Sequence, residues 1–440
     1  MVTLGKWLMI LALSVSSLQV QAADVFDING LVNQAINTHP LVGSAQAEAQ
    51  ATAEGINAAK LNLLPTPTVT SNYDSNDGMV TRAGLRQPLW TGGRLTANIN
   101  QAIYDDKAAH AYIAEQQNSV AKNTIDIWQT YIYSMALQGL YVDSLKQLSE
   151  FEAMMQRRVA QGTSARIDLD LITNRILQDQ NSYQAALQQQ RIAQARLSQS
   201  IGETLSNSTL RTVPISQMVK TIKAQSTDFE QKAFTNVDAN PSVIKQYFQI
   251  EAAKQKVKSQ ESSRYPTVYA QVEQLYYHKN SRDDNIVSLG LNYDPGAGFS
   301  NIALARATQA RVTSLEQSQE AARRVVMESV QTQYQQFVSA KDQEASLIAA
   351  VAGAQIVVDS YRRQFIAGRK TWLEVLNAVR EKTAYEQQLL QVRSQMLGAF
   401  YKLQVDFGEM PWQQRNDLTA PVNEFYPKQA FQKWLGKRHG

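Results

Sequence analysis

Two short segments of the sequence hold the residues whose types and spacing could do chemistry. Gly162 is followed, after five residues, by Asp168, and Gly368 is followed at the same spacing by Glu374. Lys370 lies between the second glycine and its acid. An ammonium and carboxylates at such turns can form ion pairs, which are electrostatic contacts rather than bond-breaking chemistry. We therefore expect these residues to hold parts of the molecule together.

A local role is the alternative for the same residues. Asp168 and Glu374 are each expected near a helix N-terminus, where the helix dipole stabilises a carboxylate whatever else it does. Likewise, Arg369 and Lys370 could be ordinary solvated cations of a turn. The sequence leaves both interpretations open.

Other patterns that carry chemistry are missing from the 440-residue sequence. It has no cysteine, and its four histidines do not cluster, so neither a disulfide framework nor a zinc site is expected. Nucleophile, phosphate-binding and metalloprotease motifs are also missing. The net charge of +4 is small for this length and gives no case for nucleic-acid binding. We therefore predict no enzyme and no cofactor.

The two turns belong to a duplication that covers most of the chain. Asp168 and Glu374 are 206 positions apart, as are Glu203 and Glu409 at the ends of the copies. Earlier landmarks agree at an offset of 201: His39-Pro40 with Asn240-Pro241, and Leu64-Pro65 with Tyr265-Pro266. Solenoid repeats usually run about 20–50 residues, so this period is too long for one. Each half should build the same unit and pack around a pseudo-symmetry axis.

Each half is predicted to contain a helix, two strands, a long helix and a further helix. In the first half, apolar periodicity predicts helices over 28–63, 94–160 and 166–201 and strands over 66–74 and 79–89. In the second half it predicts helices over 227–263, 300–367 and 372–407 and strands over 265–278 and 286–294. Each long helix should span about 100 Å at ~1.5 Å per residue, as far as two short helices end to end. Gly162 and Gly368 suit the C-terminal caps of the long helices.

The remaining segments flank these copies. Residues 1–22 combine one early lysine, an apolar run and small residues before the expected cleavage point, which predicts a secretory signal peptide. We assign 23–202 to the first repeat, 203–226 to a linker and 227–410 to the second repeat. Residues 411–440 form a predicted C-terminal periplasmic tail, whose basic residues include Lys428, Lys433, Lys437 and Arg438.

The predicted strands alternate as membrane strands facing a wet interior would. Val268, Ala270 and Val272 alternate with Gln271 and Glu273. The strand lengths are close to the roughly 9–11 residues that a tilted transmembrane strand needs, and no later stretch approaches the roughly 18 apolar residues of a transmembrane helix. Four strands cannot enclose a wide wet channel, so several chains must pool their strands.

These features together resemble the TolC family of outer-membrane channel proteins, over essentially the whole mature chain. The resemblance depends on the paired landmarks above, on Gln87-Pro88-Leu89-Trp90 with Gly92-Gly93, and on the duplicated glycine-to-acid turn. The resemblance implies an α+β membrane protein, with a long antiparallel α-helical barrel and four transmembrane β-strands per chain. It further implies a homotrimer with a twelve-stranded barrel in outer-membrane lipid and a periplasmic tunnel. The implied partners are a periplasmic adaptor protein and an inner-membrane ABC transporter or proton-driven pump.

The resemblance also implies a gate at the periplasmic tip. By motif position, Asp168 would face Lys370, and Glu374 would belong to a ring of carboxylates. Phe365 stands where the family's best-known member has a link-forming tyrosine, and Asn377 stands where it has a second acidic ring. We therefore expect a gate with fewer links and less charge. The expected adaptor contacts are the tip turns, Gly162 with Thr163 and Gly368 with Arg369.

These expectations converge on an export duct of a tripartite envelope-spanning system in the outer membrane. The absence of a lipobox cysteine favours type I secretion of a protein such as an adhesin or toxin. Multidrug or metal efflux is the alternative within this class. An alternative of another class is a periplasmic structural rod without a pore.

Overall fold

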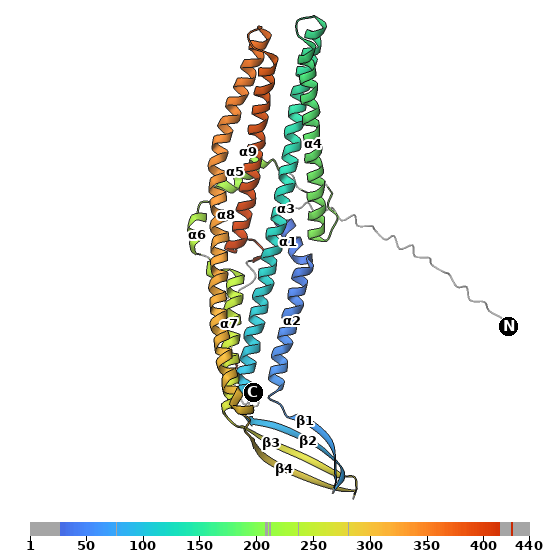
Figure 1. The fold of residues 1–440 in the computed structure, drawn as a ribbon, viewed down its shortest axis with the longest axis vertical. Helices are drawn as coiled ribbons and strands as arrows, with labels where there is room; N and C mark the ends of the chain where they lie inside the picture. Colours follow the sequence, from blue (N-terminus) through green and yellow to red (C-terminus); the bar gives the residue numbers. More distant parts are fainter. Residues whose placement is uncertain are drawn as a thin grey trace, which may run out of the picture.

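The protein is a long rod of helices with a small sheet at one end (Figure 1). The computed structural model describes residues 27–413, apart from 76, 207–209, 211–212, 236 and 280, and residues 424–425. The predicted signal peptide (1–22) and most of the predicted tail (411–440) lie outside the described residues. Two helical hairpins, α3–α4 and α8–α9, form the end of the rod opposite the sheet (Figure 1).

The elements follow the predicted plan in both halves. The first half contains α1 (Ile28–Thr38), α2 (Pro40–Leu61), β1 (Thr66–Asp74), β2 (Gly78–Trp90), α3 (Arg94–Ala160) and α4 (Arg166–Ile201). The second half contains α6 (Phe229–Thr235), α7 (Pro241–Glu261), β3 (Thr267–Tyr277), β4 (Arg282–Asn292), α8 (Ser300–Ile366) and α9 (Trp372–Phe407). Helix α5 (Ile215–Gln225) lies in the predicted linker, and short 3-10 turns cover Val237–Ala239, Ser262–Arg264 and Ala297–Phe299.

The long helices agree with the sequence prediction to within a residue. Helix α3 contains no proline, so nothing interrupts its backbone hydrogen bonds between Arg94 and Ala160. Helices α2 and α4 are stacked end to end beside α3, and α7 and α9 are stacked in the same way beside α8 (Figure 1). The predicted end-to-end stacking is therefore confirmed, although α2 and α7, with 22 and 21 residues, are shorter than predicted. Among the described residues, no helix is long and apolar enough to cross a membrane.

The predicted continuous helices over 28–63 and 227–263 are wrong, because each is broken before a proline. His39 adopts an extended backbone (φ −70°, ψ 130°), and its ring Nδ1 accepts a hydrogen bond from the Leu41 N–H at 3.2 Å. Asn240 does the same in the second copy, with its Oδ1 accepting from the Ser242 N–H at 3.1 Å. A residue before proline is disfavoured in the helical region, whereas proline is favoured at the first helical position. Each break therefore starts a new, capped helix.

The sheet joins the two halves through its central strands. Its order is β1-β2-β3-β4, antiparallel throughout, and β2 of the first copy pairs with β3 of the second. The register places one apolar row across all four strands, through Pro67, Leu85, Val272 and Val287. Val287 is 80% exposed and Val272 is 52% exposed, so none of the described residues forms a layer over this apolar face. The predicted alternation is confirmed.

The opposite face of the sheet is polar. Arg86 pairs with Gln271, and its guanidinium carbon lies 3.6 Å from the centroid of the Tyr269 ring. The Tyr269 ring occupies the space above Gly290, where an added Cβ would lie only 2.3 Å from the ring carbon Cζ. One predicted boundary is wrong here. Strand β4 starts at Arg282 rather than 286, because the polar residues at its start already pair with β3. The sequence did not reveal this start, since these residues do not alternate with apolar ones.

The main hydrophobic core lies at the middle of the rod. Phe229 stacks on Phe400 with ring centroids 5.2 Å apart and also contacts Phe337 at 5.8 Å and Phe407 at 5.3 Å. These rings join α6 to α8 and α9. A second, separate core lies at the tip and contains Phe151, Phe365 and Trp372 among its buried residues. The rod is thus fastened at its middle and at its tip.

A buried carboxylate ties the predicted linker to the middle of the rod. Glu344 of α8 is 3% exposed and forms ion pairs with Lys223 of α5 and with Arg393 of α9, the latter at 2.7 Å. Burial alone would raise the pKa of Glu344, but the hydrogen bonds from both cations outweigh it and hold the pKa below its usual range. Helix α5 of the linker is therefore clamped to both helices of the second hairpin. Sequence reasoning missed this triad because its members are far apart in the chain.

Candidate functional site at the tip of the helices

The two tip turns have the same backbone geometry. Gly162 and Gly368 adopt left-handed conformations, with φ of 69° and 72°. In the first turn, Thr163 N–H donates to Arg158 O at 2.9 Å, and in the second, Arg369 N–H donates to Gln364 O at 2.9 Å. These bonds, with those of the two glycine N–H groups, form Schellman caps on α3 and α8. The prediction that both glycines cap the long helices is confirmed.

The helices that follow the two turns begin differently. Helix α9 starts with a capping box, in which Thr371 Oγ1 accepts from the Glu374 N–H and a Glu374 carboxylate oxygen accepts from the Thr371 N–H at 2.8 Å. The N-cap residue of helix α4 is Ala165, which has no side chain able to cap. Asp168 is the positional equivalent of Glu374, yet its carboxylate forms no ion pair with any described residue. Glu374 therefore has the local capping role, whereas Asp168 makes no equivalent capping bond among the described residues.

Lys370 pairs with Glu374 within the same turn. Its Nζ lies 2.6 Å from Glu374 Oε1 and 4.6 Å from the centroid of the Tyr361 ring. The hydrogen bond from Lys370, followed by those from Thr371, lowers the pKa of Glu374 to about 2. The same bond raises the pKa of Lys370. Lys370 and Glu374 thus largely neutralise each other, and no contact between Lys370 and Asp168 occurs among the described residues of one chain.

Phe365 lies inside the tip core rather than at a polar link. It is 7% exposed, and its ring centroid is 5.0 Å from that of Trp372. Arg158 of α3 places its guanidinium carbon 4.8 Å from the centroid of the Phe365 ring. Phe151, also of α3, contacts Trp372 of α9 edge-on at 5.6 Å. An arginine over an aromatic face and an edge-to-face pair are attractive contacts, so they hold the two tip hairpins together.

The other predicted tip residues are exposed. Asn377 is exposed one turn after Glu374, and Thr163 and Arg369 are exposed at the turns. Sequence reasoning found Lys370 and Glu374 but missed Thr371, Tyr361 and Arg158. Of these three, only Thr371 left a readable signal, because a threonine three residues before a glutamate marks a capping box. The contacts of Arg158 and Tyr361 follow from the fold alone.

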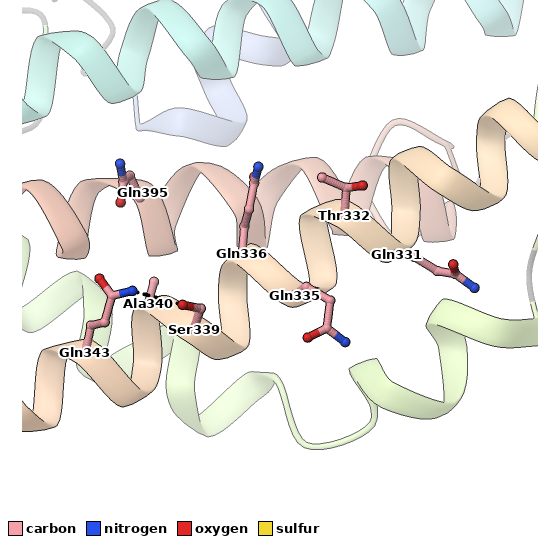
Figure 2. A pocket seen from close by; sticks show the side chains of 8 residues that line it. All are labelled: Gln331, Thr332, Gln335, Gln336, Ser339, Ala340, Gln343 and Gln395. Atoms are coloured by element: carbon pink, nitrogen blue, oxygen red, sulfur yellow. Dashed lines mark hydrogen bonds between the residues drawn. The ribbon is translucent and has the colours of Figure 1, made fainter.

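A groove between α8 and α9 lies near the middle of the rod, with a volume of about 620 Å³. Glutamines dominate its lining, and Gln336 and Gln395 extend toward the same side, away from Gln335 (Figure 2). No titratable side chain lines this groove. Among the described residues, no group of three or more metal-ligating side chains is assembled.

The depressed pKa of Glu374 gives a testable pH dependence. Its pKa falls from 4.5 to about 2 on folding, so its stabilising contribution is complete above pH ~4.5 and is lost as pH falls through about 2. Hydrogen exchange of residues 366–376 should be faster in Glu374→Gln than in the unmodified protein at pH 6. This difference should shrink progressively as the pH falls from 4.5 toward 2.

The matched control is Glu381→Gln, which alters a carboxylate on the same helix that accepts a hydrogen bond from the Tyr385 hydroxyl at 3.0 Å. This variant should leave exchange of the turn unchanged at every pH. Equal exchange of Glu374→Gln and the unmodified protein at pH 6 would show that the capping box does not stabilise the tip.

Comparison with known proteins agrees with this architecture. A family model described as "Outer membrane efflux protein" matches residues 31–203 and 237–408. Outer membrane efflux protein BepC of Brucella suis biovar 1 (strain 1330) is 22% identical over 445 residues, covering 97% of this chain and 95% of that protein.

Solved structures share the fold at low sequence identity. A membrane protein from Pseudomonas aeruginosa has a TM-score of 0.74 at 12% identity, covering 91% of this chain and 94% of that one. The outer membrane protein VceC of Vibrio cholerae has a TM-score of 0.70 at 12% identity, covering 87% of this chain and 96% of that one. The predicted fold class and outer-membrane location are confirmed. The chain belongs to the outer membrane efflux protein family, a family of TolC-like channels.

Proposed function

We propose that this chain is the outer-membrane duct of a tripartite exporter, passive itself and driven by an inner-membrane transporter through a periplasmic adaptor. The observation that carries the proposal is one rod with a two-faced sheet at one end and two charged turns at the other. Its long helices span about 100 Å at ~1.5 Å per residue, a length suited to crossing a periplasmic gap. Cargo would enter at the tip and leave at the sheet.

The sheet supports assembly with other copies of the chain. Strands β1 and β4 are its two edges, and neither has a second partner strand in the described part of the chain. In a homotrimer, β4 of one protomer would pair with β1 of the next, so that twelve strands close on themselves. The exposed Val272 and Val287 would then face lipid, and Arg86 and Gln271 would face the wet interior.

The tip supports a gate made between protomers. Lys370 carries three N–H donors and gives one to Glu374, so it retains donors for a second carboxylate. Asp168, which lacks an ion pair within the described chain, would be that carboxylate on the neighbouring protomer. Within each protomer, the contact between Arg158 and Phe365 would hold the two hairpins as one unit. Opening would then separate protomers at the Lys370–Asp168 link.

Removing either partner of this link should open the tip. Lys370→Ala and Asp168→Ala should each raise the resting conductance of the reconstituted trimer several-fold, and the double variant should add little to either single change. Lys382→Ala, which removes a paired lysine farther along α9, is the matched control and should leave conductance unchanged. If both tip variants conduct like the unmodified protein, the gate assignment fails even though the fold stands.

Small-molecule efflux and protein secretion are the two candidates for the cargo. The efflux proposal is supported by the name of the Brucella relative, an efflux protein, although the two chains share only 22% identity. Type I secretion of a protein by an ABC transporter is favoured instead by the lack of cysteine in the 440 residues. Both use the same duct and differ in the inner-membrane partner.

A deletion strain separates the two cargo classes. Efflux predicts increased sensitivity to drugs or metal ions with unchanged secretion, and type I secretion predicts loss of a secreted adhesin or toxin with unchanged sensitivity. Complementation of the deletion strain with the Glu381→Gln variant should fully restore the parental drug or metal resistance, or the parental secretion. A strain with neither phenotype, in conditions where the protein is produced, would contradict the export proposal.

A further inference from the structure

An exposed phenylalanine occupies a position where the first copy of the repeat has a glycine. Phe299 is the N-cap residue of α8 and Gly93 is the N-cap residue of α3, and the two are 206 positions apart, the same offset as the tip turns. Both backbones are left-handed, with φ of 61° at Phe299 and 91° at Gly93. Glycine adopts this conformation freely, whereas a bulky residue is strained in it. The backbone of this turn therefore does not account for the phenylalanine.

Packing within the chain does not account for the phenylalanine either, because its side chain is 60% exposed. The turn around it is held by hydrogen bonds: the Phe299 N–H donates to Gly296 O at 3.1 Å, and Asn301 Nδ2 donates to Asp294 O at 3.2 Å. A strained residue that the surrounding structure holds in place points to a function for that residue. What phenylalanine adds to this turn is an aromatic ring on the surface.

The exposed ring continues the apolar face of the sheet. Val287 and Leu291 lie on that face of β4 and are 80% and 67% exposed. Tyr293 continues the same alternation just after the strand and is 51% exposed. Ile302, 37% exposed, follows three residues after Phe299, so the two share one side of the start of α8. An apolar surface thus runs from the sheet onto the helix.

Strand length places this surface at the edge of the bilayer. Strands β3 and β4 have 11 residues each. At about 3.3 Å per residue and a tilt of ~45°, they cross roughly 25 Å, which is the height of the apolar band of an outer-membrane barrel. The turn between β4 and α8 lies where the strands meet the helices (Figure 1). Because the helices extend into the periplasm, Phe299 is at the periplasmic boundary of the membrane.

A basic residue follows on the same side of α8. Arg306 is exposed and lies seven residues after Phe299, about 10 Å farther from the sheet at ~1.5 Å per residue. Aromatic and aliphatic side chains favour the boundary of the acyl chains, whereas arginine is attracted to the phosphate groups just outside it. The order of Phe299, Ile302 and Arg306 along the helix therefore matches the order of layers at a membrane surface.

We propose that Tyr293, Phe299 and Ile302 form a lipid anchor, which inserts between phospholipids of the periplasmic leaflet of the outer membrane while Arg306 bonds their phosphate groups. The anchor would hold the start of α8 at a fixed depth. Helix α3, which begins after Gly93, has no side chain at the matched position. This inference rests on the proposed outer-membrane duct and does not depend on its cargo.

The cysteine-free sequence allows a spin label to be placed at one chosen position. Phe299→Cys, Val287→Cys and Gln309→Cys are labelled separately, and the full-length protein is reconstituted in bilayers of phosphatidylethanolamine and phosphatidylglycerol. Electron paramagnetic resonance then compares collisions of the label with oxygen, which concentrates in lipid, and with a water-soluble nickel chelate. We expect the ratio of oxygen to nickel collisions at position 299 to be several-fold higher than at position 309 and lower than at position 287.

The control positions separate the possible failures. A ratio at position 299 equal to that at 309, with position 287 in lipid, would overturn the anchor and leave the duct standing. Few collisions with either reagent would show that position 299 is covered by a neighbouring protomer, which would also overturn the anchor. Exposure of position 287 to the nickel chelate would contradict the duct itself, and the anchor with it.

Phe299→Gly tests the role of the ring, because glycine suits the left-handed turn and should leave the fold intact. With the label on Ile302→Cys, the additional change Phe299→Gly should lower the ratio of oxygen to nickel collisions several-fold. Phe299→Leu, which keeps an apolar side chain, should change this ratio little. Heat-resistant trimers on a gel check that each variant is assembled. An unchanged ratio in Phe299→Gly would show that the ring does not anchor α8.

Discussion

The antiparallel pairing of β2 with β3 is the interaction on which the rest of the structure depends. It fastens the two copies of the repeat side by side at one end, so the long helices α3 and α8 must leave the sheet in the same direction. Both tip turns then meet at the far end of the rod. Without this pairing, the sheet would not hold Asp168 of one copy at the same level along the rod as Glu374 of the other. The distance between sheet and tip follows from the proline-free length of α3 and α8.

The duplication gives two similar turns, but the side chains differentiate them. The second turn neutralises itself, because Lys370 and Thr371 satisfy the Glu374 carboxylate within one chain. The first turn lacks a capping side chain at Ala165 and leaves its carboxylate without an ion pair among the described residues. In the proposed trimer, this inequality would let Asp168 of one protomer bond Lys370 of its neighbour. Symmetric copies of one turn would not provide this complementarity.

The sequence predicts regular elements well and specific contacts poorly. Absence of proline predicts the long helices, and alternation of apolar residues predicts the strands. Apolar spacing continues across His39-Pro40 and therefore wrongly predicts one continuous helix there, although the proline itself signals the break. The start of β4 was missed because Arg282 and Asp284 do not alternate with apolar residues. At the tip, the residue types indicated ion pairing, but only the fold could reveal that Lys370 bonds Glu374 and that Arg158 covers Phe365.

The central claim is that several copies pool their strands into a duct that is nearly shut at the tip. Single-channel recording of the purified protein in a planar lipid bilayer tests it most directly. The account predicts stable, small, cation-preferring steps, because the two carboxylates of Asp168 and Glu374 would outnumber the one ammonium of Lys370 at the proposed gate. Anion-preferring steps would contradict it. So would the absence of any step from inserted trimers that carry Lys370→Ala together with Arg158→Ala.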